Sequence, residues 1–115
     1  MPLHHEHDGQ TDVLATDIDV ASSLFAKARG LMGCSRLPAD YAMYFPFERV
    51  RTRGVHMVFV RTPLDVVWLV EDTVRRVETL GPWTGHARAR ADAFVELPEG
   101  AASEVTVGDT VRLVA

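Results

Sequence analysis

The sequence predicts a mainly β domain of the α+β class, an antiparallel β-sandwich or partly closed barrel of about six or seven strands with one packed short helix. Residues 54–70 carry the strongest signal, two apolar runs hinged at Arg61-Thr62-Pro63. Pro63 lacks an N–H and fixes its own φ, so the hinge cannot lie inside a helix or a central strand. Other short segments alternate apolar and polar residues between turn signals, and one segment has helical spacing. A chain of 115 residues with 47% hydrophobic content fits a single domain with one core.

The first half of the chain supplies an edge strand, the helix and a second strand. Residues 13–20 alternate in part and predict the edge strand. Residues 22–33 place apolar side chains at helical spacing, with a serine at the start to cap the helix and glycines at its end. Residues 41–47 predict a strand that ends at Pro46, and the arginine-rich residues 48–53 predict a charged connection.

The second half of the chain predicts further strands separated by short turns. Two strands flank the hinge in residues 54–70, and the tight turn Glu71-Asp72 leads into a return strand over residues 73–80. A loop with Trp83 over one end of the core follows. The remaining expectations are a short exposed helical turn at 87–92, strands at 93–97 and 110–114, and a helical turn at 100–105.

Composition and charge limit the possible partners. The net charge of −4 and the pI near 5.7 argue against nucleic acid or an anionic membrane as a partner. The lone Cys34 excludes an intramolecular disulfide and suits a reducing compartment. The first residues have no secretory pattern, and no run approaches the roughly 20 apolar residues of a membrane span. We therefore expect a soluble, cytoplasmic protein, monomeric or homodimeric.

Residues 1–10 contain His4, His5 and His7 and little that is apolar, which predicts a disordered tail ahead of a single domain over residues 11–115. If Met1 is removed, the new terminus could bind Cu(II) or Ni(II) through its amine, two backbone nitrogens and His4. The alternative is a solvated tail that picks up metal adventitiously, because imidazole is a good ligand anywhere.

Three blocks of sequence form a recognisable set. They are residues 28–33 (ARGLMG), His56-Met57 followed by residues 62–65 (TPLD), and residues 96–100 (ELPEG) before residues 107–109 (VGD). Taken together, these blocks resemble the uncharacterised family called domain of unknown function 192. The resemblance covers roughly residues 13–114 and implies a compact β-rich sandwich with a packed helix and no established activity. Many relatives have Trp where this chain has His56 and Arg where it has Cys34.

Asp65 and Arg29 are the polar pair of most interest, because both lie in these blocks and a carboxylate within an apolar strand needs a partner. Asp65 could form a structural ion pair or cap the turn at Thr62-Pro63. Alternatively, Arg29, His56, Thr62 and Asp65 line a small polar pocket in which the guanidinium clamps a carboxylate or phosphate.

Two functions follow from these residues. The first is a non-enzymatic binding module for a small anionic or amphipathic ligand, or for a protein partner, near Arg29, His56 and Asp65. The second is a small metal-assisted or hydrolytic enzyme using His56, Asp65 and His86, although no H-x-H or H-E-x-x-H spacing supports a metal site there. No cofactor motif is present, so we expect no cofactor and no bound metal. Cys34 follows a predicted helix end that disfavours thiolate, which argues against a Cys-His nucleophile.

Overall fold

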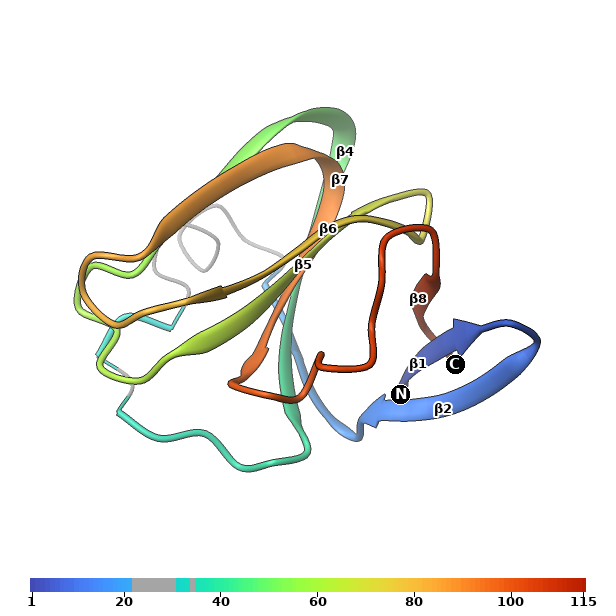
Figure 1. Ribbon diagram of the computed structural model, residues 1–115, viewed down its shortest axis with the longest axis horizontal. Helices are drawn as coiled ribbons and strands as arrows, with labels where there is room; N and C mark the ends of the chain where they lie inside the picture. Colours follow the sequence, from blue (N-terminus) through green and yellow to red (C-terminus); the bar gives the residue numbers. More distant parts are fainter. Residues whose placement is uncertain (22–30, 34) are drawn as a thin grey trace.

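The computed structural model describes residues 1–21, 31–33 and 35–115, and within these ranges eight strands form one open sheet (Figure 1). Their order across the sheet is β2-β1-β8-β6-β5-β7-β4-β3. The strands are β1 (Leu3–His7), β2 (Gln10–Ala15), β3 (Asp17–Val20), β4 (Tyr41–His56), β5 (Leu64–Val70), β6 (Thr73–Leu80), β7 (His86–Pro98) and β8 (Thr110–Leu113). Only the β3–β4 pairing is parallel among the described strands. The mainly β prediction is confirmed, but the strands form one sheet that does not close.

Strand β5 is the centre of the sheet, as its apolar run predicted. It lies between β6 and β7, and six of its seven residues are buried. Successive side chains of a strand point to opposite faces. Leu64, Val66 and Trp68 therefore pack into one core with Phe45 and Phe94. Val67 and Leu69 pack into a second core on the other face. Two apolar layers thus explain why β5 reads as a nearly continuous hydrophobic segment.

The predicted hairpin at Glu71-Asp72 is confirmed. Val70 lies opposite Thr73, so Glu71 and Asp72 alone connect β5 to β6. Their φ angles are 48° and 67°. Two central residues with positive φ are the mark of a primed turn, whose twist matches that of the flanking strands.

Strands β4 and β7 are longer than the sequence predicted. Residues 48–53, expected as a connection, lie inside β4, and residues 87–92, expected as a helical turn, lie inside β7. Ala87, Ala89 and Ala91 pack toward a core while the arginines between them face outward, which is strand alternation. Small alanines favour a helix locally, but packing against β4 overrides that propensity. Between Pro46 and Arg51 the register shifts, where Pro46 has no N–H for the ladder.

The predicted helix over residues 22–33 falls mainly on residues 22–30, which lie outside the described residues, as does Cys34. Residues 31–33 form a turn, and the described ranges contain no helix. No segment of them therefore has the helical length and apolar character that crossing a bilayer requires.

The prediction of a disordered tail is wrong for residues 3–7, which form β1. This strand lies inside the sheet, between β2 and β8. Leu3 is fully buried in a core and His5 is 4% exposed. The polar local sequence does not predict this burial, because the burial depends on pairing with β8 at the other end of the chain (Figure 1).

Candidate functional site

Asp65 is a buried structural carboxylate. It is 3% exposed, and Oδ1 accepts a hydrogen bond of 2.7 Å from the Thr79 hydroxyl. Oδ2 accepts from the backbone N–H groups of Gly100 and Ala102, at 3.0 and 2.9 Å. The carboxylate therefore caps the turn that follows β7, and not the turn at Thr62-Pro63 that the sequence suggested.

The other predicted site residues lie elsewhere. Arg29 is outside the described residues. Thr62 is partly exposed in the loop between β4 and β5, and His56 is exposed at the end of β4. Asp65 lies opposite Leu97, whereas His56 lies opposite His86, so the two positions are at opposite ends of β7. The structure brings His56 and His86 together, but not with Asp65.

His56 and His86 border a surface hollow of about 550 Å³, lined also by Gly54, Val55, Ala87 and Arg88. Gly54 lies opposite Arg88 in the β4–β7 ladder. A side chain built at Gly54 would meet no atom of the described residues within 4 Å. The missing side chain at Gly54 therefore leaves open space beside Arg88.

Two aromatic residues lie on the loops that continue from these strand ends. Phe59 follows β4 and is 56% exposed; Trp83 precedes β7 and is 48% exposed. Their rings meet edge to face, with centroids 5.4 Å apart. The Trp83 N–H donates to the Val60 carbonyl at 3.1 Å, and the Met57 N–H donates to the Gly85 carbonyl at 3.0 Å. These bonds hold the two loops side by side.

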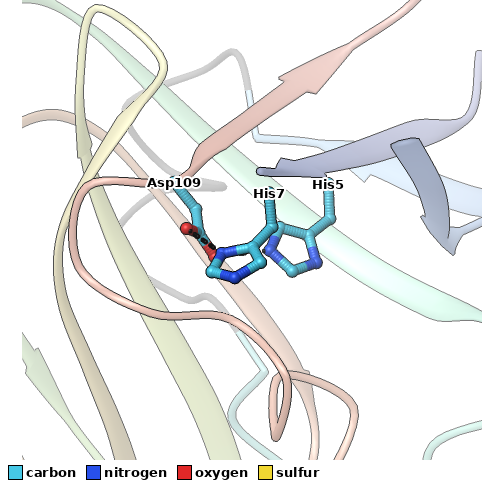
Figure 2. Close-up of side chains that lie close together, drawn as sticks. All are labelled: His5, His7 and Asp109. Carbon is cyan, nitrogen blue, oxygen red and sulfur yellow. Dashed lines mark hydrogen bonds and ion pairs between the residues drawn. The ribbon is translucent and has the colours of Figure 1, made fainter. Parts of the chain in front are cut away.

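A second cluster joins the two ends of the chain, as Figure 2 shows. The Asp109 carboxylate contacts His5 Nε2 at 2.7 Å through Oδ2 and His7 Nδ1 at 2.6 Å through Oδ1. The Thr106 N–H also donates to Oδ2, at 3.0 Å. His5 and Asp109 are buried, whereas the His7 side chain is 47% exposed. One ligand atom from each of these three residues lies within 4.8 Å of the others.

Charge interactions in this cluster shift two pKa values. Burial alone would raise the pKa of Asp109, but hydrogen bonds from His5, His7 and Thr106 outweigh it and hold that pKa far below its usual range. The hydrogen bond to Asp109 and the charges of Asp109 and Asp8 raise the pKa of His7. The cluster therefore favours a negative carboxylate beside imidazole.

Sequence reasoning missed Phe59, Arg88 and Asp109 as site residues. Asp109 was visible only as a turn residue, and no local signal joins it to histidines more than 100 positions away. Phe59 lies in an apolar run and was assigned to a strand. Arg88 stands among alternating alanines and arginines, a pattern that indicates an outward face only once β7 is recognised as a strand.

Comparison with known proteins finds solved structures with a similar fold and one matching family. A structure from Sinorhizobium meliloti 1021, described as a candidate transcription regulator, is similar with a TM-score of 0.86 and 23% identity over 96% of this chain and 90% of that one. A protein of unknown function from Novosphingobium aromaticivorans is similar with a TM-score of 0.84 and 21% identity, covering 97% of this chain and 84% of that one. Curated proteins give no match. The model of the family DUF192, described as "Uncharacterized ACR", matches residues 4–113, and the chain belongs to that family.

Proposed function

We propose that this protein is a non-enzymatic binding module for a small ligand that combines an anionic group with an aromatic body. One observation carries the proposal. Phe59 and Trp83 have φ angles of 62° and 67°, and both side chains are about half exposed. Bulky residues with positive φ are outliers, and such outliers concentrate at functional sites.

The cost of these conformations needs a compensating role. A non-glycine residue with positive φ costs on the order of 1 kcal/mol or more. An aromatic side chain that is half exposed returns only part of its burial energy. The backbone conformations of Phe59 and Trp83 therefore add little to the free energy of folding. Their effect is to present an aromatic surface at one end of the sheet.

The neighbouring hollow supplies the anion-binding half of the site. Arg88 is a permanent cation with five donors, and His56 and His86 add imidazole groups that can donate. A volume of about 550 Å³ lies within the range of small-molecule sites. A ligand with a sulfonate, carboxylate or phosphate beside a ring would pair with Arg88 and stack near Phe59.

The test compares two fluorescent probes on the purified full chain, 8-anilinonaphthalene-1-sulfonate and the uncharged N-phenyl-1-naphthylamine. Wild type should bind the sulfonate more tightly. Arg88→Gln should weaken sulfonate binding by about two- to fivefold, since exposed ion pairs contribute up to about 1 kcal/mol, and leave the neutral probe unchanged. Phe59→Asn should weaken both probes by about two- to tenfold, the value of an aromatic contact.

Val107→Asn is the matched control. Val107 is a 67% exposed apolar residue. Its neighbour Gly108 bonds to Val74 near the start of β6, whereas Trp83 follows the other end of that strand. Phe59→Asn should itself leave the free energy of unfolding within about 0.5 kcal/mol, because relief of the positive φ offsets the lost ring contact. Equal binding by wild type and Phe59→Asn, or no binding of either probe to wild type, would reject the proposal.

A further inference from the structure

We infer that His5, His7 and Asp109 form a binding site for one divalent metal ion, either zinc or a similar first-row transition metal. The site is separate from the aromatic surface and does not depend on the function proposed for it. Its three side chains converge from the two ends of the chain (Figure 2).

The sheet positions the three ligands. His5 and His7 are two residues apart on β1, so their side chains project from the same face of the strand. Strand β1 pairs with β8, and Asp109 immediately precedes β8. The Thr106 N–H donates to Oδ2 at 3.0 Å and so helps to fix the orientation of the carboxylate. His4 lies between the two histidines and projects to the other face, opposite Val13 and Arg112 in the ladders.

The separations are close to those that a coordinated ion needs. The imidazole nitrogens lie 2.7 and 2.6 Å from the Asp109 oxygens. Ligand atoms around a tetrahedral ion with bonds of about 2.0–2.1 Å lie about 3.3 Å apart. Each nitrogen lies less than 1 Å closer to its oxygen than this separation, and the three ligand atoms lie within 4.8 Å of one another, so the outermost pair must close by up to about 1.5 Å. Coordinate bonds then replace the two hydrogen bonds, and the protons of those bonds move to the other ring nitrogen or to solvent. His7 can make this adjustment because its side chain is half exposed.

The surroundings of His7 match those of known metal-binding histidines. His7 faces Asp109 through Nδ1, and its Nε2 lies 3.1 Å from a carboxylate oxygen of Asp8. A carboxylate behind a ligating imidazole orients the ring and raises its basicity. The side of the cluster that faces solvent opens into a hollow lined by Glu6, Asp8, Thr11 and Thr110, which leaves room for water or a further ligand.

The donor set selects the class of ion. Two imidazole nitrogens and one carboxylate suit Zn²⁺, Co²⁺, Ni²⁺, Cu²⁺ or Fe²⁺, whereas Mg²⁺ and Ca²⁺ require mainly oxygen ligands. The same contacts would also tie β1 to the Asp109 turn without an ion. The experiment must therefore separate metal binding at this cluster from chelation by any histidine near the chain terminus.

The test titrates the metal-free full chain with Zn²⁺ by calorimetry and with Co²⁺ by visible absorption, in wild type, His7→Gln and His4→Gln. Wild type and His4→Gln should bind one ion with equal affinity and show the intense visible bands of low-coordinate Co²⁺. His7→Gln should bind at least about tenfold more weakly, since even outer-shell changes at metal sites cost 10- to 100-fold. Zn²⁺ should raise the thermal midpoint of wild type and His4→Gln but not of His7→Gln.

Three results would overturn the inference. His4→Gln could weaken binding as much as His7→Gln, which would show chelation by the terminal histidines as a group. His7→Gln could bind as tightly as wild type. Mg²⁺ could compete equally with Zn²⁺, which would show a nonspecific acidic site. Asp109→Asn provides a second ligand variant that keeps an acceptor for the Thr106 N–H, and it should weaken Zn²⁺ binding while the far-ultraviolet dichroism stays that of the wild type.

Discussion

Glu96 is a carboxyl group held inside an apolar core. It lies on β7 opposite Met43 and Val66, and its side chain is 6% exposed. Among the described residues its Oε1 has no hydrogen-bond partner. Burial raises the pKa of Glu96 from 4.5 to about 8. The group is therefore mainly protonated at neutral pH in the folded protein and ionised in the unfolded chain.

This difference predicts how stability changes with pH. Because the folded-state pKa is the higher one, the contribution is fully present below the unfolded value of 4.5 and is lost as pH rises to about 8. Glu96→Gln cannot ionise, so it should match wild type near pH 4.5 and exceed it above pH 8, by roughly 5 kcal/mol at most. Urea unfolding of both proteins across this range measures the difference. Parallel curves would show that Glu96 does not titrate in this way.

Asp65 is a second buried carboxyl group, and it differs from Glu96 in its hydrogen bonds. Its three donors come from Thr79, Gly100 and Ala102, so both oxygens are bonded. Asp65→Ala would remove the acceptor of the buried Ala102 N–H and of the partly buried Gly100 N–H, and it should cost about 3 kcal/mol.

Asp65→Asn should cost clearly less, roughly 1–2 kcal/mol. The amide oxygen can take the place of Oδ2, and the Thr79 hydroxyl can turn to accept from the amide nitrogen. The midpoints of urea unfolding for the two variants decide the matter. An asparagine as damaging as alanine would mean that a charged group, and not the hydrogen-bond geometry, is required at this position.

At the scale of the element, β1 depends on partners from both ends of the chain. It pairs with β2 and with β8, and Leu3 lies fully buried in a core. His5 and His7 bond to Asp109. These contacts give a short polar segment a place in the interior of a sheet, which its own composition would not support.

Removal of residues 1–8 should therefore lower the free energy of unfolding by about 4 kcal/mol or more. Burial of Leu3 accounts for roughly 1.5–3 kcal/mol, and the ladder hydrogen bonds to β8 contribute the rest. Chemical denaturation of the truncated and full chains gives the value. Leu3→Ala, expected to cost about 2–5 kcal/mol, separates the packing effect from the loss of the strand. A truncated chain within about 0.5 kcal/mol of the full chain would instead indicate a dispensable tail.

At the scale of the whole molecule, local sequence patterns predicted the elements whose partners are near in the chain. The hairpin of β5 and β6 was predicted because Glu71-Asp72 joins two strands that pair directly. The place of β1 was not predicted, because its partner β8 lies about 100 residues further on, and such pairing leaves no mark in composition. Residues 87–92 were misassigned because burial of alternate alanines depends on β4.

The candidate site was predictable to a similar degree. A need for partners around Asp65 follows from its apolar strand, but two of the partners are backbone N–H groups of Gly100 and Ala102, which any residue provides. His56 and His86 were named together, but only as members of a candidate site with Asp65. Their pairing requires the register of β4 with β7, which includes the shift after Pro46. The positive φ of Phe59 lacks the glycine or asparagine that usually reveals it.

The pairing of β1 with β8 also has a consequence for synthesis. A ribosome makes β1 more than 100 residues before it makes β8. During that interval the hairpin of β1 and β2 exposes the unpaired backbone edge that β8 will cover, and such an edge can pair with other chains. The contacts between β1 and β8 also carry a large loop-closure cost, which slows folding. The nascent chain therefore completes its sheet only after residues 110–113 have left the ribosome. Until then, a chaperone bound to the hairpin of β1 and β2 would keep its exposed edge from pairing with other chains.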